Sequence, residues 1–461
     1  MINILKNVLS EFDGIDYGEL RYHERISNVI SIRKGELETI ASNNYSGVGV
    51  RTLYQSGWGF SSTSRTDISE IKQAISDAIA SAKVSSQGKK NKSIKLAKVN
   101  LAQGKFQPTI NDALTNHTFE EKLELVKKTE EKLKNASSII QSSSVVYREM
   151  LDKKIIVTTD GAACEVIDSK PEFRVFVFAS NGKEYVESIE AVGITGGWAD
   201  LFQEKKPDDF IDIVVRRAEA LLKAEYPKGE RSAVILDPSL VGLISHEAIG
   251  HTVEADFVLS GAITKGKIGT RVGSDLVTLF DSGAEGSAGG TLLVDDEGVI
   301  TKKIIIIDKG ILKSYLHNRE TAAEFGVEPT GNARAFEYSD EPIIRMRNTG
   351  IERGKQSLDE IIAGVKQGYL LKGTKGGQAD ANAEFMFAAQ EAYRITDGKL
   401  GALLRGVTIS GQAFDVLKSV DAVSDDFKWD MGSGYCGKWQ YAKVDGGGPY
   451  IRCNAIIGGR Q

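Results

Sequence analysis

The sequence predicts an α+β protein of two domains, in which largely antiparallel or mixed sheets pack against helices. Segments of alternating apolar and polar residues, typical of half-buried strands, occupy much of the chain, and amphipathic segments with helical spacing lie between them. A length of 461 residues also exceeds what one hydrophobic core usually organises. The segment PKGERS interrupts the pattern with Pro, Gly and charges, so we expect domains at 1–228 and 229–461.

The elements of the first domain follow from changes in hydrophobic period. Residues 2–12 have helical spacing, whereas residues 17–64 alternate and contain short Gly and Asn turns, which predicts an antiparallel meander. Strand-like patterns return from 137 to about 200. Three further segments have helical spacing together with helix-start signals: 67–85, 119–136 after a Thr118–Glu121 capping box, and 207–226 with Pro207 near its start.

The second domain begins with a short apolar strand, AVILDP. Pro238 then opens a helix that we expect to continue to Leu259. Later segments are rich in glycine and strand-like, with helices expected near 319–325, 358–367 and 411–421. The glycines at 446–448 predict a turn or a place where the backbone approaches another group closely.

Composition excludes several classes of protein. The chain has 58 Lys+Arg and 63 Asp+Glu, and the resulting net charge of −5 argues against a dedicated nucleic-acid binder. The lysines of the segment 85–93 have no aromatic neighbours, which is typical of a solvated loop. No stretch is apolar and long enough to span a bilayer, and the start of the chain lacks the pattern of a secretory signal. The cysteines are odd in number and Cys164 is far from Cys436 and Cys453, so they form no disulfide framework and we expect a cytoplasmic protein.

A cluster of metal-binding residue types lies in the segment SHEAIGH. Two of the five histidines, His246 and His251, fall within six residues, and Glu247 directly follows the first. Neutral imidazoles bind Zn²⁺ well, and an adjacent carboxylate can activate a water molecule for hydrolysis. In the usual helical zinc motif the two histidines are four residues apart and share one face. Here they are five apart, so a regular helix would aim them about 140° apart.

Both imidazoles can hold one metal if the helix widens as a π-bulge or kinks between them. Gly250 would ease such a distortion, and we therefore predict a distorted turn between His246 and His251. The alternative interpretation is a regular helix with one core histidine, one exposed histidine and an incidental glutamate. Glu254, three residues after His251, either accepts the second imidazole N–H of a ligand or is a solvated carboxylate.

A catalytic zinc usually has three protein ligands, so two histidines leave it one short. The candidates for the third ligand are Cys436, His317, Cys453 and the acidic residues near the histidines. Cys436 lies among glycines in GSGYCGKWQ, where the backbone can approach a site. Cys453 lies in an apolar strand-like run that is typical of a core residue, and His317 has no supporting neighbours.

The chain resembles the TldD/PmbA family of metallopeptidases, once described as modulators of DNA gyrase, and in particular its catalytic TldD-type members. The resemblance rests on SHEAIGHTVEAD, then on GSAGGTLLVDDEG, PTGNARAF and GGQAD in the same order, and on the C-terminal GYCGKWQ and CNAIIGG. It covers nearly the whole chain. One departure follows the CGK block, where WQYAKVDGGGPYIRCN contains bulky aromatic residues and Cys453.

The resemblance implies that His246, His251 and Cys436 are metal ligands and that Glu247 is the general base. It also implies a Zn²⁺ cofactor, a cytoplasmic location and unfolded peptides as substrates. As a partner it implies either a second copy, giving a homodimer, or a PmbA/TldE-type paralogue that lacks the HExxxH residues, giving a heterodimer. Neither nucleic acid nor a membrane is expected as a partner.

The leading hypothesis is therefore a zinc-dependent metallopeptidase that hydrolyses peptide bonds in unfolded peptides, with water as the fourth zinc ligand. The alternative is a non-hydrolytic, metal-stabilised subunit that binds peptides or a partner and keeps the same ligands. Glu247 discriminates between the two hypotheses, because a purely structural metal site does not need a general base.

Overall fold

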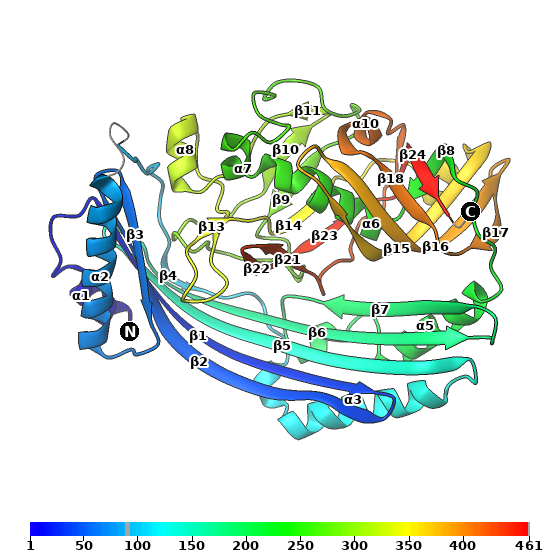
Figure 1. Ribbon diagram of the computed structural model, residues 1–461, viewed down its shortest axis with the longest axis horizontal. Coiled ribbons are helices and arrows are strands. Elements are labelled where there is room, and N and C mark those ends of the chain that lie inside the picture. The colour runs from blue at the N-terminus through cyan, green and yellow to red at the C-terminus, as the bar shows by residue number, and fades with distance from the viewer. Residues whose placement is uncertain (88–92, 460–461) are drawn as a thin grey trace.

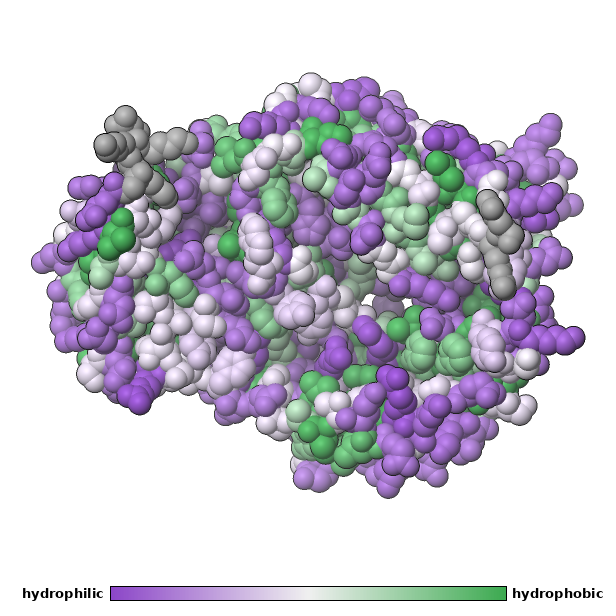
Figure 2. Space-filling model, viewed as in Figure 1, coloured by the Kyte–Doolittle hydropathy of each residue, from purple (hydrophilic) through white to green (hydrophobic). Residues whose placement is uncertain are grey.

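A computed structural model describes residues 1–87 and 93–459, and it confirms the predicted α+β class. The N-terminal half forms one long curved sheet, and the C-terminal half forms a body of shorter sheets that lies on the concave side of this sheet (Figure 1). The basic segment predicted as a loop at 85–93 lies mostly outside the described residues. No helix of the described residues combines the length and the apolar character needed to cross a membrane. Hydrophilic and hydrophobic residues are interspersed on the face shown in Figure 2.

Within the described residues the long sheet has seven strands, in the order β3-β2-β1-β5-β6-β4, with β7 paired to β6. The β1–β2 and β2–β3 pairs are antiparallel, which confirms the meander predicted at 17–64, and only β4 runs parallel to its described neighbour. The strands are β1 (Tyr17–Arg33), β2 (Glu36–Tyr54), β3 (Gly57–Thr63), β4 (Gln103–Phe106), β5 (Ile140–Thr158), β6 (Ala163–Ser180) and β7 (Tyr185–Gly193).

Helices cover the long sheet at one end and on the face turned away from the C-terminal body (Figure 1). α1 (Ile2–Leu9) and α2 (Ile68–Gln87) pack at the end, and α3 (Phe119–Asn135) and α5 (Pro207–Leu221) share a core with the middle strands. The predicted capping box of α3 is confirmed, since Glu121 N–H donates to Thr118 Oγ1 at 3.2 Å and Thr118 N–H donates to Glu121 Oε2 at 2.8 Å. Two short helices, η1 (Leu114–Asn116) and α4 (Trp198–Leu201), complete this half.

A small closed barrel forms one part of the C-terminal body. Because β15 pairs with both β8 and β16, the five strands β15, β8, β24, β18 and β16 close on themselves, and β17 and β19 add at the outside. These strands are β8 (Glu230–Leu236), β15 (Gln367–Ala379), β16 (Glu384–Thr396), β17 (Lys399–Leu404), β18 (Thr408–Gln412), β19 (Ala422–Val423) and β24 (Ile451–Gly458).

A second sheet of the body runs in the order β11-β10-β9-β14-β23-β20, and two small two-stranded pairs stand beside it. The sheet strands are β9 (Leu279–Ser282), β10 (Ile304–Asp308), β11 (Ile311–Leu312), β14 (Asn348–Ile351), β20 (Lys428–Trp429) and β23 (Asp445–Gly448). The pairs are β12 (Ala333–Arg334) with β13 (Ile343–Ile344), and β21 (Tyr435–Lys438) with β22 (Gln440–Lys443). The peripheral helices are α8 (Arg319–Phe325), α9 (Leu358–Ala363) and α10 (Ala413–Lys418).

Several predicted helices are longer than the observed ones, including the N-terminal helix expected at 2–12, which ends at Leu9. The helix expected at 207–226 ends at Leu221, because Glu225 forms a parallel bridge with Leu404. α9 ends at Ala363 instead of 367, because the strand β15 already begins at Gln367. α10 covers only 413–418 of the predicted 411–421, because β18 continues to Gln412.

Buried charged side chains join the long sheet to the C-terminal body. Arg51 of β2 contacts Glu297 at 2.7 Å, and Lys154 of β5 contacts Asp296 at 2.8 Å. Lys443 of β22 forms a further ion pair with Glu172 of β6. Buried ion pairs are sensitive to geometry, because removing one partner leaves an uncompensated charge. The concave face of the sheet thus holds the body, including the β21–β22 hairpin, in one position.

Gly242 lies where the helix α6 (Pro238–Leu243) crosses the glycine-rich strand β23. A Cβ atom at Gly242 would lie 2.6 Å from Gly447 N and against the carbonyl carbon of Gly446. The prediction that the glycines at 446–448 permit a close backbone approach is confirmed.

Gly242→Ala is expected to lower the free energy of unfolding by about 1–3 kcal/mol, because the new methyl group meets backbone that cannot rotate away. Gly229→Ala is the matched control, since a Cβ there would meet no atom closer than 3.8 Å. Urea unfolding followed by circular dichroism measures both variants. Equal stability of the two would show that α6 and β23 are not packed as described.

Candidate metal centre

The helix that carries the two histidines begins at an anchored cap. Asp237 follows β8, and its carboxylate accepts the Leu240 N–H at 3.1 Å, as expected of an N-cap residue. The other carboxylate oxygen accepts the Gly373 N–H of β15 at 2.7 Å. One side chain therefore fixes the start of α6 both to its own first turn and to the barrel.

The predicted distortion between His246 and His251 is present. α6 continues into a π-helical turn at Ile244–Gly250, followed by a single 3₁₀ turn at His251–Val253. The wider turn brings the two imidazoles together, with ring centroids 5.3 Å apart and planes at 80°. Gly250 leaves space for Met346, because a Cβ atom at this residue would lie against the Met346 sulfur.

The helix expected to run to Leu259 is wrong beyond the 3₁₀ turn. Glu254 has extended backbone angles, φ −66° and ψ 121°, and a short α7 (Ala255–Leu259) starts after it. The cause is a parallel bridge to Leu316: the Leu316 N–H donates to Val253 O at 2.8 Å, and the Ala255 N–H donates to Leu316 O at 2.9 Å. Pairing between distant segments overrides the local helical pattern.

Cys436 reaches the two histidines from the β21–β22 hairpin. Its Sγ lies 3.2 Å from His251 Nε2, and one ligand atom each of His246, His251 and Cys436 lie within 4.8 Å of one another. Two other candidates for a third ligand, His317 and Cys453, lie elsewhere, whereas Glu247 and Glu254 lie beside His251. The His317 Nδ1 contacts Thr321 Oγ1 at 3.1 Å, and Cys453 is buried in β24 within the barrel core.

The three side chains have the chemistry of a zinc site. His246 is only 1% exposed, and neither of its ring nitrogens has a hydrogen-bond partner within the described residues. Buried polar atoms without a partner are costly unless another group, such as a metal ion, satisfies them. Burial opposes ionisation of Cys436, but the two imidazoles outweigh it and lower the pKa of the thiol to about 4. The thiolate form is the one that binds metals.

Glu247 stands at the solvent side of this cluster. Its carboxylate lies 3.8 Å from His251 Nε2, and its side chain is 28% exposed, whereas that of His246 is buried. The His251 side chain is also 21% exposed. Solvent therefore reaches the cluster from the side on which the Glu247 carboxylate lies.

Glu254 and Lys438 lie behind His251 and orient it. The fully buried Glu254 carboxylate contacts His251 Nδ1 at 3.1 Å, which leaves Nε2 directed towards Cys436. Burial raises the pKa of Glu254, but His251, Lys438 and Arg345 outweigh this and hold it below its ordinary value. Lys438 Nζ contacts Glu254 at 3.1 Å and Asp256 at 2.7 Å, and donates to Ile344 O at 3.1 Å.

Sequence reasoning did not assign a role to Lys438, although the CGK block contains it. The signal that was available is its spacing: Lys438 is two residues after Cys436, and alternate residues of a strand face the same side. The pairing of Lys438 with Glu254 could not be predicted from spacing, because the two residues are 184 positions apart in the sequence.

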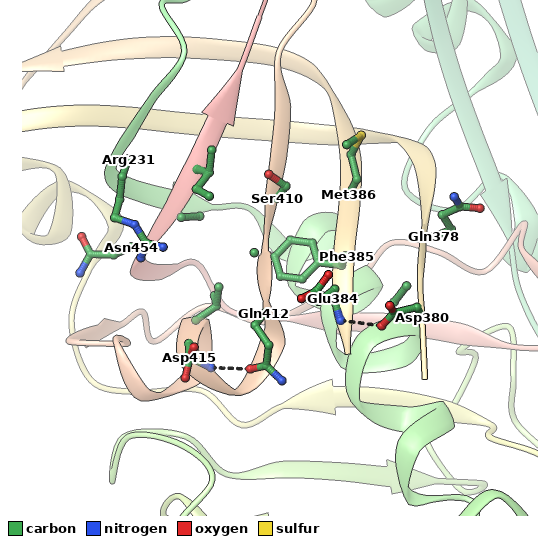
Figure 3. A pocket seen from close by; sticks show the side chains of 15 residues that line it. Arg231, Gln378, Asp380, Glu384, Phe385, Met386, Ser410, Gln412, Asp415 and Asn454 are labelled. Atoms are coloured by element: carbon green, nitrogen blue, oxygen red, sulfur yellow. Dashed lines mark hydrogen bonds between the residues drawn. The ribbon is translucent and has the colours of Figure 1, made fainter. Parts of the chain in front are cut away.

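A separate pocket on the barrel is not part of this centre. Figure 3 shows it between β16, β18, β24 and α10. Two of its polar side chains stabilise local turns, since Asp380 accepts the Glu384 N–H and Gln412 accepts the Asp415 N–H, both at 3.0 Å. None of the residues that line it is a histidine or a cysteine.

Three family models match the chain. They are PmbA/TldA metallopeptidase domain 1 at residues 18–82, the central domain at 112–222 and the C-terminal domain at 229–458. The division at 228/229 that we predicted stays a prediction.

Similar proteins span the full chain. A metalloprotease of Methanocaldococcus jannaschii is 38% identical, covering 96% of this chain and 97% of the relative. A zinc metalloprotease TldD homolog of Saccharolobus solfataricus is 30% identical and covers 97% of each. Among solved structures, a Thermotoga maritima protein has a TM-score of 0.80 at 19% identity, covering 99% of both chains. TldE from Thermococcus kodakarensis has a TM-score of 0.76 at 19% identity with the same coverage, which shows the shared fold.

Lys438→Met is expected to weaken Zn²⁺ binding about 10–100-fold, because Glu254 and Asp256 lose their shared cation and the support of His251 is disturbed. Lys428→Met, at an exposed lysine of β20, is the control. Competition with a fluorescent zinc chelator measures both affinities. Unchanged zinc affinity of Lys438→Met would contradict the positioning role.

Proposed function

The chain belongs to the PmbA/TldA metallopeptidase family, and from this premise we propose that it is a zinc peptidase that cleaves unfolded peptides at the His246, His251 and Cys436 site. That it is a metallopeptidase follows from its relatives. The single observation that supports the zinc site is the convergence of two imidazoles and one thiol around the buried, otherwise unpartnered His246 ring.

A bound Zn²⁺ would supply Lewis acidity towards the attacking water and the substrate carbonyl. The remaining steps belong to side chains of this chain. Glu247 accepts a proton from the water as it attacks and then delivers that proton to the leaving amine. Glu254 holds the Nδ1 side of His251, so that Nε2 stays available as a ligand. The contacts of Glu247 at 3.8 Å and of Glu254 at 3.1 Å with His251 support these two roles.

Substrate binding through an extended backbone is supported by the free edge of the hairpin. Within the described residues β21 pairs only with β22, so its other edge presents unpaired backbone groups next to Cys436. A Cβ atom at Gly437 would meet nothing within 4 Å, so the outer face of the hairpin is also open at this residue. A peptide added as a strand would gain backbone hydrogen bonds without strict sequence requirements. An unfolded peptide can pair along its whole length, whereas most backbone groups of a folded protein are already hydrogen-bonded.

The partner and the location of the protein are proposed from its family resemblance. We propose a homodimer or a heterodimer with a PmbA/TldE-type paralogue, in the cytoplasm. The three cysteines are free and buried, which agrees with a reducing compartment. A non-hydrolytic peptide-binding subunit is the alternative, and the accessible position of Glu247 favours hydrolysis over it.

Cys436→Ser is expected to lose bound zinc, because a hydroxyl is a far weaker ligand than a thiolate. Cys453→Ser, in the barrel core, is the matched control and should keep one zinc per chain if it folds. Elemental analysis of the dialysed proteins gives the stoichiometry. Full zinc occupancy in Cys436→Ser would exclude the sulfur as a ligand.

Glu247→Gln is expected to keep its zinc and to lose at least about 100-fold in kcat on an unfolded peptide, because no carboxylate accepts the proton of water. Digestion followed by mass spectrometry, with and without chelator, measures cleavage. If wild type and variant both bind peptide and neither cleaves it, the alternative of a binding subunit holds.

A further inference from the structure

Trp439 occupies the tip of the hairpin that carries Cys436, in an unusual backbone conformation. The register pairs Lys438 with Gln440, so Trp439 alone makes the turn, with φ at +59°. Positive φ is favourable for glycine and unfavourable for a residue with a bulky side chain. A glycine would make this turn with less strain, so the fold itself does not explain the indole.

The indole also lies in solvent. Trp439 is 86% exposed, more than any other large hydrophobic side chain of the described residues, and Tyr441 in the next strand is 62% exposed. Large apolar groups that project into water beside a functional cleft are typical of binding surfaces. Both the backbone conformation and the exposure thus indicate a role outside the folded chain itself.

The residues on either side of Trp439 are fixed. Lys438 is held by the ion pairs behind the metal centre. Gln440 accepts the Phe336 N–H at 2.7 Å and donates to Glu341 O at 2.7 Å. The turn is therefore not a loose loop, and the indole is presented in a defined direction.

Ring contacts connect the indole to the metal centre. The Phe257 ring centroid lies 6.3 Å from that of His251 and 6.1 Å from that of Trp439. A side chain of a peptide that lies along β21 therefore meets an aromatic surface next to the cleavage site. The Lys438 ammonium is 5.9 Å from the indole centroid, so a second cation on that ring would be repelled. The surface suits a neutral, apolar side chain.

We propose that Trp439, with Phe257, binds a large apolar side chain of the peptide substrate, so that the protein prefers to cleave next to aromatic or large aliphatic residues. This inference rests on the proposed peptidase function. The substrate is favoured as occupant because Phe257 connects the indole to His251, so a group bound on this surface lies next to the proposed cleavage site.

The test compares two unfolded peptides that differ only in one residue near the cleaved bond, Phe or Ala. The wild type is expected to show a kcat/KM about tenfold higher for the Phe peptide, and Trp439→Gly is expected to show a ratio near one. Glycine suits the turn, so this variant should fold at least as well as the wild type. Trp439→Phe keeps a ring and should keep most of the preference, and Tyr185→Ala removes a distant, 62% exposed aromatic as the control.

Binding to the zinc-loaded Glu247→Gln variant, with and without Trp439→Gly, separates this inference from the hydrolytic function. Fluorescence anisotropy of labelled Phe, Ala and Arg peptides gives the affinities. Tighter binding of the Phe peptide that depends on Trp439 supports the inference even if no peptide is cleaved. A preference that persists without the indole, or tightest binding of the Arg peptide, overturns it. A loss of dimer in Trp439→Gly with unchanged peptide preference also overturns it, because the indole is then a subunit contact.

Discussion

The π-helical turn at Ile244–Gly250 is the constraint on which the candidate site depends. A regular helix would point His246 and His251 about 140° apart and leave one of them without access to Cys436. A π turn is less favourable than an α turn, so the surroundings must stabilise it. Asp237 anchors the helix to the barrel before the turn, and the pairing of Glu254 with Leu316 ends the helix after it. Contacts before and after the π turn thus stabilise the distortion that the five-residue spacing of the histidines requires.

Charge is organised in layers around the same turn. The outer layer contains Glu247, which faces solvent. The middle layer contains the imidazoles and the thiol, which is ionised because the pKa of Cys436 lies far below its ordinary value. The inner layer contains Glu254 and Lys438, both fully buried and paired with each other. Each buried charge therefore has a partner of opposite sign, which is the condition under which proteins tolerate buried charges.

Local features of the site could be predicted from the sequence, and distant ones could not. The five-residue spacing and Gly250 predicted the distorted turn, because helix geometry relates residues within one or two turns. Residue spacing alone left Cys436 among several candidates for the third ligand, since it lies 185 residues from His251, and only the family resemblance singled it out. The pairing of Lys438 with Glu254 and the break at Glu254 depend on strand pairing between remote segments, which local propensity does not encode. The closure of the barrel, in which β15 pairs with both β8 and β16, also depends on contacts between segments that are distant in the sequence.

The buried ion pairs between the long sheet and the C-terminal body have a consequence for how the chain folds. Before the two halves meet, Arg51 and Lys154 on one side and Glu297 and Asp296 on the other are hydrated charges. Apolar residues lie beside these charges on both sides, since Ile156 and Val166 of the sheet share a buried cluster with Val294 of the body. Hydration of the charges therefore opposes the burial of these apolar residues until the two halves meet in register. If the two halves docked without forming these ion pairs, unpaired charges would be buried. The cost of removing those charges from water disfavours such misassembled forms.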